Sequence, residues 1–401
     1  MTERIRVFDT TLRDGEQSAG VCFSARDKLE IAARLAALGV DVVEAGFPGA
    51  SRAEARAVAG VAREVRDTAV CALARAVPAD VDAAGEAVRG AARPRIHVFV
   101  NSSDMHLAHQ LRRSREEVVA MAAAMVRRAR GWTSDVEFSP MDATRADPEF
   151  LAELARAALG AGATTLNVPD TVGCARPGQV AELIRSLREA VPELAEAVIS
   201  FHGQDDLGLA TANALAAVEA GARQIEVAVN GIGERAGNTS FEEVVMALRV
   251  HGKALGAATG VDARGIHALS TLVAGRSGIP VAPNKAVVGR NAFRHASGVH
   301  QDGVLKHRET YEVIDPAEIG HPDGSQIVLG KLSGRAGFAA RASALGFRLG
   351  GPALDRAFRR FQAVADQVAE VDDAAVRRIC LGGGGGCGGG GLRTPGFALD
   401  L

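Results

Sequence analysis

This chain of 401 residues contains only five cysteines and one tyrosine, and its net charge is small. The five cysteines are odd in number and widely scattered, so they indicate neither a disulfide framework nor a paired zinc motif, and they favour a reducing cytosol. The formal net charge of −2 gives no basic field for nucleic acid or a membrane surface. No apolar run has membrane-spanning length, and the N-terminus lacks a signal-peptide pattern. We therefore expect a cytoplasmic protein without a nucleic-acid or membrane partner.

The chain does contain enough apolar material for a large core. Hydrophobic residues make up 47% of it and charged residues 23%, which is typical of a soluble globular protein. A length of 401 residues is too great for one ordinary domain and fits a large barrel with an appended module.

Short β-rich runs alternate with longer helical stretches, such as residues 27–38 and 177–191, which is the pattern of βα units around a parallel sheet. Eight such units in about 250 residues predict an α/β fold, a (β/α)₈ TIM barrel. The predicted strands are Ile5–Asp9, Asp41–Gly46, Ala69–Ala74, Arg95–Val100, Asp135–Ser139, Thr164–Val168, Ala197–Phe201 and Gln224–Val229.

The pattern changes after the barrel. We expect the catalytic barrel over residues 1–265, followed over 266–380 by a linker and a smaller, mostly helical C-terminal module. Within the module an amphipathic helix is predicted around 352–368. Residues 381–401 begin with a glycine-rich run that has almost no side chains to bury, so they are predicted to form a flexible tail.

Polar residues that follow the strands are the first place to look for chemistry, because TIM barrels bind ligands on the loops after their strands. After the first strand come Arg13 and Asp14, a guanidinium beside a carboxylate. Asp14 can ligate a hard divalent cation, and Arg13 can neutralise an oxyanion on an attacked carbonyl. A surface ion pair is the alternative interpretation of adjacent Arg and Asp.

The seventh and eighth strands add further donors at the same end. Alternation along the seventh strand places His202 and Gln204 on one face, and the glycine-rich stretch after the eighth strand ends at Asn238. A single strand-end histidine can equally be a structural residue. Combined nitrogen and oxygen donors favour Mg²⁺, Mn²⁺ or Co²⁺ over a thiolate-bound soft metal.

These stretches carry a resemblance that covers the barrel and most of the module. The chain resembles the 2-isopropylmalate synthase and homocitrate synthase family, within the wider superfamily of metal-dependent barrel lyases and synthases. The matching stretches are FDTTLRDGEQ (8–17), VEAGFPGAS (43–51), NVPDTVG (167–173), HGQDDLGLATAN (202–213), NGIGERAGN (230–238), NAFRHASGVHQDGVLK (291–306) and ETYEVIDPAEIG (309–320).

The resemblance implies roles for individual residues. Asp14, His202, Asn238 and the position of Gln204 match the family's metal ligands, and Arg13 matches the arginine that polarises the carbonyl of a 2-oxo acid. Residues that match the oxo-acid site are His97, Ser139, Asn167 and Thr171.

The resemblance also implies a composite site in a homodimer. In the family the post-barrel module reaches over the active site of a partner subunit, and His300 and Tyr311 match its catalytic histidine and tyrosine. The implied reaction joins acetyl-CoA to a 2-oxo acid: a base removes a proton from the acetyl methyl group, the enolate attacks the metal-bound carbonyl, and hydrolysis of the thioester releases CoA.

Three departures from the family pattern affect these expectations. Gln204 and Asp205 stand where the family's HxHND motif has histidine and asparagine, so we expect altered metal affinity. Met141 replaces the acidic residue after the fifth strand, which leaves the general base unassigned. The chain also lacks the leucine-binding regulatory domain of full-length 2-isopropylmalate synthases, so we expect no feedback control by leucine.

Altered ligands in a well-matched scaffold suggest a paralogue specialised on an unusual oxo acid, such as phosphinopyruvate or phosphonopyruvate in an antibiotic pathway. Leucine- or lysine-type amino-acid biosynthesis is the main alternative. A lyase resembling 3-hydroxy-3-methylglutaryl-CoA lyase is another, because Cys387 lies in a glycine-rich run like the loop of that lyase. A barrel that has lost its metal and serves only as a binding partner is the non-enzymatic alternative.

Overall fold

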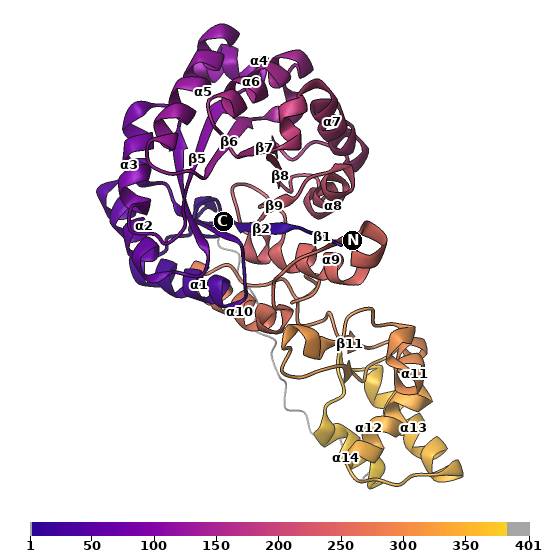
Figure 1. The fold of residues 1–401 in the computed structure, drawn as a ribbon. Helices are drawn as coiled ribbons and strands as arrows, with labels where there is room; N and C mark the ends of the chain where they lie inside the picture. Colours follow the sequence, from indigo (N-terminus) through magenta and orange to yellow (C-terminus); the bar gives the residue numbers. More distant parts are fainter. Residues whose placement is uncertain (1, 383–401) are drawn as a thin grey trace. The chain divides into compact units, whose positions relative to one another are not determined.

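The computed structural model describes residues 2–382 (Figure 1). Eight parallel strands of the described chain form a closed barrel, in which each strand pairs with the next along the chain and the first pairs with the last. The prediction of a TIM barrel is confirmed. The barrel strands are β2 (Arg6–Asp9), β3 (Val42–Gly46), β4 (Ala69–Arg75), β5 (Pro94–Asn101), β6 (Val136–Met141), β7 (Thr165–Asp170), β8 (Val198–Gly203) and β9 (Gln224–Val227).

A ring of helices surrounds the barrel (Figure 1). Helix α1 is typical: the Ser24 side chain caps its N-terminus in a reciprocal pair with Asp27, and Ile31 and Leu35 face the strands. The ring consists of α1 (Ala25–Ala37), α2 (Arg52–Glu64), α3 (Pro78–Val88), α5 (Arg115–Arg130), α6 (Pro148–Gly160), α7 (Pro177–Ala190), α8 (Ala210–Ala220) and α9 (Phe241–Leu255).

Two smaller elements complete this part of the chain. The two-residue strand β1 (Glu3–Arg4) pairs in parallel with β10 (Ala257–Ala258), outside the barrel. Helix α10 (Ile266–Ser277) follows, and its contacts with α1 attach it to the barrel.

The interior of the barrel is charged near its middle. The guanidinium of Arg95 donates to Glu137 Oε2 at 3.0 Å and to Gln224 Oε1 at 2.7 Å. The Gln224 amide nitrogen in turn donates to Glu137 and to Ser200 Oγ. These buried groups are paired with one another, so the network satisfies its hydrogen bonds within the barrel interior.

Described residues after the barrel form a second compact unit, consisting of Phe293–Val313 together with residues 325–382, whereas Ile314–Gly324 belongs to the barrel unit. Strand β11 (Arg294–His295) pairs with β12 (Gln326–Ile327). The helices are α11 (Gly298–Lys306), α12 (Arg335–Ala344), α13 (Gly351–Ala365) and α14 (Asp373–Cys380), around a core that includes Phe338 and Phe361. The mostly helical character predicted for this module is confirmed, and the boundary at residue 265 stays a prediction.

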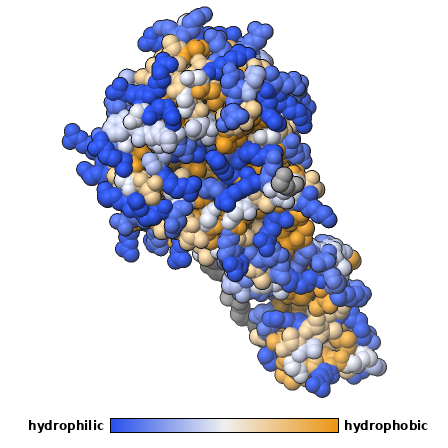
Figure 2. Space-filling model, viewed as in Figure 1, coloured by the Kyte–Doolittle hydropathy of each residue, from blue (hydrophilic) through white to orange (hydrophobic). Residues whose placement is uncertain are grey.

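Most of the visible barrel face is polar, whereas apolar residues are interspersed on the module (Figure 2). Among residues 2–382, no helix combines the length and apolarity that crossing a membrane requires. The tail predicted over 381–401 lies, from residue 383, outside the described residues.

Candidate active site

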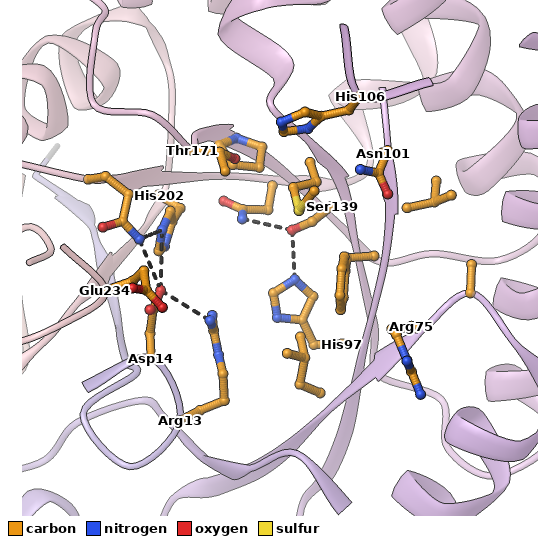
Figure 3. A pocket seen from close by; sticks show the side chains of 18 of the residues that line it. Arg13, Asp14, Arg75, His97, Asn101, His106, Ser139, Thr171, His202 and Glu234 are labelled. Carbon is orange, nitrogen blue, oxygen red and sulfur yellow. Dashed lines mark hydrogen bonds and ion pairs between the residues drawn. The ribbon is translucent and has the colours of Figure 1, made fainter. Parts of the chain in front are cut away.

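A cavity of about 870 Å³ opens at the carboxyl ends of the barrel strands (Figure 3). Its lining includes all four predicted oxo-acid residues, Arg13, and three of the predicted metal ligands, Asp14, His202 and Gln204. Side chains predicted from separate strand ends therefore converge on one space, as the geometry of a TIM barrel requires.

Asp14, His202 and Gln204 meet at one side of this cavity. The Gln204 amide nitrogen donates to Asp14 Oδ2 at 3.3 Å, and His202 Nε2 lies 3.5 Å from the same oxygen. Gln204 forms an isolated antiparallel bridge with Asn238, which brings that residue to the group. His202 and Gln204 lie on the same face, as alternation along the strand predicted.

The loop before Asn238 depends on glycine. Gly237 has φ +98°, and a Cβ there would lie 2.0 Å from the carbonyl oxygen of Gly231. A Cβ on Gly233 would lie 2.4 Å from Asn238 Oδ1. Both glycines therefore keep the Asn238 side chain beside the strand ends.

Buried oxygens in this group fit a hard divalent cation. Within the described residues, Asp14 Oδ1, Gln204 Oε1 and Asn238 Oδ1 are buried without a hydrogen-bond partner. Unsatisfied buried oxygens are costly unless a ligand completes them. His202 donates from Nδ1 to Glu226 Oε2 at 2.8 Å, which directs Nε2 toward Asp14 as a metal-binding histidine requires. The donor set matches the O and N ligands of Mg²⁺, Mn²⁺ or Co²⁺.

A second group of possible ligands lies deeper in the barrel, where His97, Glu137 and Glu226 bring ligand atoms within 4.8 Å of one another. Both ring nitrogens of His97 already have partners, Glu44 at 2.8 Å and Ser139 at 2.6 Å. Glu137 is held by Arg95 and Gln224. In this group only Glu226 Oε1 lacks a hydrogen-bond partner, whereas the group beside Asp14 has three such oxygens, so the group beside Asp14 is the better metal site.

The Arg13 side chain is only 11% exposed and Asp14 is buried, so the interpretation of this pair as a surface ion pair is wrong. Arg13 Nε donates to Glu44 Oε2 at 2.6 Å, and one terminal nitrogen lies 3.1 Å from Asp14 Oδ2. Burial by itself raises the pKa of Glu44, but Arg13 and His97 outweigh it and lower that pKa to about 2. Glu44 thus stays ionised and fixes Arg13 at the edge of the cavity.

His97, Ser139 and Asn167 form a chain of hydrogen bonds across the cavity wall. Ser139 Oγ lies 2.6 Å from His97 Nε2 and accepts from the Asn167 amide at 2.8 Å. Burial lowers the pKa of His97, but the charge of Glu44 more than offsets this and raises it. Thr171 also lines the cavity, and its Oγ accepts from the backbone nitrogen of Asp142.

His300 and Tyr311 lie together in the module. Their rings stack with centroids 4.0 Å apart, and Tyr311 is exposed. Their catalytic role stays a prediction.

Sequence reasoning missed several residues that build the site. Glu44 and Glu226 fix Arg13 and His202, and each is a glutamate with apolar neighbours on both sides in a buried strand, which was the available signal. His106 lines the cavity beside the buried carboxylate of Asp142, and no role was predicted for either residue.

The burial of Asp9 gives a prediction about pH. Burial raises the pKa of Asp9 to about 7, against two opposing hydrogen bonds from Thr11. In the unfolded chain the Asp9 carboxyl has its ordinary pKa of 3.8. Its contribution to the free energy of unfolding is therefore fully present below pH 3.8 and is lost as the pH rises through 7. In the wild type, the free energy of unfolding should fall by up to about 4 kcal/mol over this pH range. Asp9→Asn has no carboxyl to titrate, so this fall should be absent and the urea midpoint should depend less on pH. Asp67→Asn, at an exposed site, is the control, and equal slopes in wild type and Asp9→Asn would contradict the assignment.

Comparisons with known proteins identify relatives of both parts of the chain. The HMGL-like family matches residues 4–273, and the family described as homocitrate synthase post-HMGL domain-like matches residues 287–369. The 2-isopropylmalate synthase of Carboxydothermus hydrogenoformans is 52% identical over 92% of this chain and 73% of its own length. That of Pyrococcus furiosus is 51% identical over 96% of this chain and 77% of its own length.

Among solved structures, the HMG-CoA lyase of Bacillus subtilis superposes with a TM-score of 0.60 at 21% identity, covering 72% of this chain and 97% of the lyase. The carboxyl transferase domain of Rhizobium etli pyruvate carboxylase, in complex with pyruvate, gives 0.53 at 18% identity and covers 94% of this chain and 59% of that one. At such identities the likeness concerns the fold alone.

Proposed function

The chain belongs to the HMGL-like family, among the 2-isopropylmalate synthases and their relatives. On that basis we propose that it condenses acetyl-CoA with the 2-oxo acid of one specialised pathway. It is an acyltransferase of the type that converts an acyl group into an alkyl group on transfer (EC 2.3.3). The observation that carries the proposal is the convergence of Arg13, Asp14, His202 and Gln204 at one cavity with unsatisfied buried oxygens.

Asp14, His202, Gln204 and Asn238 would hold the divalent cation. When bound, the cation polarises the carbonyl of the 2-oxo acid and so favours attack on it. Glu226 holds the His202 ring in the orientation that leaves Nε2 for this purpose.

The remaining cavity residues bind the oxo acid and stabilise charge. Arg13 points a guanidinium, fixed by Glu44, at the oxygen on which negative charge develops. Thr171 and Asn167 offer polar groups to the oxo acid, while the His97–Ser139 pair lines its side chain. These groups are already held by partners, so little reorganisation is needed when substrate binds.

Two candidate substrates are each supported by a different observation. Gln204 in the metal group and Met141 in the cavity wall depart from the family pattern and favour a specialised oxo acid, such as phosphinopyruvate or phosphonopyruvate in an antibiotic pathway. The identity of about half to proteins named 2-isopropylmalate synthase favours the second candidate, 2-isopropylmalate formation in cytoplasmic amino-acid biosynthesis.

Release of free CoA tests the function directly. Purified enzyme with Mn²⁺ and acetyl-CoA is given phosphonopyruvate, phosphinopyruvate, 2-oxoisovalerate or 2-oxoglutarate, and thiol formation is measured together with the product mass. We expect a 2-substituted malate from one of the phosphorus acids. Preference for 2-oxoisovalerate would select the second candidate, and no CoA release from any oxo acid would refute the condensation.

Replacement of Gln204 by histidine tests whether this residue is a ligand. An imidazole binds Mn²⁺ or Co²⁺ more strongly than an amide oxygen, so Gln204→His is expected to retain metal on the order of tenfold better during dialysis against chelator. Gln17→His, at another position on the cavity lining, is the matched control. An unchanged metal affinity would remove Gln204 from the ligand set.

We also infer that His300 and Tyr311 complete the site of a second copy in a homodimer. The support is their stacked, accessible arrangement in a module that also exposes Val299 and Val313. There the imidazole and phenol would donate to the thioester carbonyl oxygen of acetyl-CoA.

Complementation measures this composite site. His300→Ala and Arg13→Lys are each expected to be inactive, but subunit exchange between them should restore about a quarter of wild-type turnover, because half of the dimers then carry one intact site of two. Arg13→Lys mixed with Asp14→Asn is the control for nonspecific recovery, because both changes lie in the barrel and no mixed dimer then has an intact site. A fully active monomer in sedimentation analysis would exclude the arrangement.

A further inference from the structure

His106 and Asp142 form a second polar group on the cavity, separate from the residues assigned above. His106 ends a short helix, α4 (Asp104–His106), that follows β5, and its ring lines the cavity (Figure 3). Asp142 follows β6 directly and is completely buried. His106 Nδ1 lies 3.6 Å from Asp142 Oδ2, and within the described residues this nitrogen is buried without a hydrogen-bond partner.

Asp142 is held firmly in an unfavourable backbone conformation. Its φ of +69° is in the left-handed region, which costs energy in a non-glycine residue. Arg145 donates to both carboxylate oxygens, with its terminal nitrogen 2.7 Å from Oδ2, and the Ser103 hydroxyl donates to the same oxygen. Its backbone nitrogen donates to Thr171 Oγ at 2.9 Å. A strained, fully buried carboxylate fixed from three sides is suited to orienting a neighbouring ring.

The proposed condensation needs a base that Met141 cannot supply. Of the titratable side chains that line the cavity in residues 2–382, the arginines bind protons too tightly to accept one. Asp14 and His202 belong to the metal group, which Glu226 supports. Both ring nitrogens of His97 are occupied. His106 and the exposed Glu234 remain, and only His106 has a buried carboxylate behind it.

We propose that His106, positioned by Asp142, is the general base that removes the methyl proton of acetyl-CoA. The inference rests on the proposed condensation. The Nδ1 edge of the ring faces Asp142, so Nε2 is the nitrogen available to the cavity. A catalytic hydrogen bond often tightens only when substrate binds, so the separation of 3.6 Å is compatible with this role.

The proton and electron balance of the step is simple. The methyl C–H bond breaks, its proton moves to His106 Nε2, and its electron pair forms the C=C bond of the thioester enolate. The enolate carbon then bonds to the carbonyl carbon of the 2-oxo acid, whose π pair becomes an alkoxide. The alkoxide takes the proton from His106 and becomes a tertiary hydroxyl, which restores the base for the next turnover.

Turnover and proton exchange test the role. His106→Ala and His106→Gln are expected to lower kcat by about 10²- to 10⁴-fold with little change in the KM for the oxo acid. Both should abolish exchange of the acetyl-CoA methyl protons with D₂O, measured by NMR with a slow oxo-acid analogue bound. Added imidazole should partly rescue His106→Ala, and the acidic limb of the pH profile should vanish in His106→Gln. Asp142→Asn, a positioning variant, should lower kcat while the limb remains.

The chain provides a matched control in His109→Gln, because His109 is exposed one turn away and does not line the cavity. This variant is expected to keep wild-type kcat. Retention of kcat within threefold in either His106 variant, or loss of exchange in Glu234→Gln with exchange kept in the His106 variants, would overturn the assignment. Either result would contradict the role of His106 although the wild type still released CoA. Failure of the condensation itself would instead appear as no CoA release by the wild type.

Discussion

Turnover is expected to fall by at least about 10³-fold when Asp14 is replaced by asparagine, because a bound cation contributes several kcal/mol to stabilising the developing charge. Asp14 is the only carboxylate among the four side chains of the group, so the variant leaves neutral donors only. It should also purify with little metal. Elemental analysis and CoA release measure the two effects on the same samples.

Removal of the metal from the wild type should reproduce the loss, and added Mn²⁺ should reverse it. Asp82→Asn, which removes a carboxylate from the outer surface beside Arg128, controls for the change of net charge and should behave as wild type. Full turnover after treatment with EDTA, with no metal detected, would show that the group beside Asp14 is not a catalytic metal centre.

Replacing Arg13 is expected to have the second large effect, a loss of about 10²- to 10³-fold in kcat, similar to removal of one oxyanion donor elsewhere. Arg13→Lys keeps the charge next to Glu44 and should still fold. A lysine cannot divide its contacts between Glu44 and Asp14 as the planar fork does, so the group at the cavity edge is misplaced. CoA release and thermal melting of the same variant separate catalysis from stability.

Arg13→Gln extends this test to stability. It leaves the buried Glu44 carboxylate without its main cation, and removing one partner of a buried pair costs about 3–5 kcal/mol. Arg75→Lys is the control, since Arg75 also lines the cavity but is largely exposed and binds Asp80. Turnover in Arg13→Lys equal to that of Arg75→Lys would exclude the proposed role of Arg13.

Sequence reasoning located the barrel because its strands carry their own signal. Buried parallel strands are nearly continuous apolar runs separated by amphipathic helices, and all eight predicted strands overlap the observed ones with ends differing by no more than two residues. The module carried a weaker signal. Helix α13 was predicted from its periodicity, but α12 and α14 were not, because packing around Phe338 and Phe361 stabilises these short helices.

The candidate site likewise contains residues that the sequence predicted and residues that it did not. Asp14, His202 and Gln204 were predictable because strand ends converge whatever the side chains are. Contacts between strands were not predictable from order along the chain, and for this reason Glu44 and Glu226 were missed. The left-handed backbone of Asp142 also has no sequence signature, since aspartate usually adopts other conformations. Without it nothing directs attention to His106.

The seam between the first and last barrel strands has a consequence for biosynthesis of the protein. Strand β2 pairs with β9 along its whole length, and the Asn238 amide donates to Thr10 across 228 positions of sequence. The group beside Asp14 therefore cannot assemble while β9, the last barrel strand, and the loop after it are still inside the ribosome. A nascent chain carries its catalytic aspartate and arginine from the start, yet it stays inert toward cation and substrate until the barrel closes.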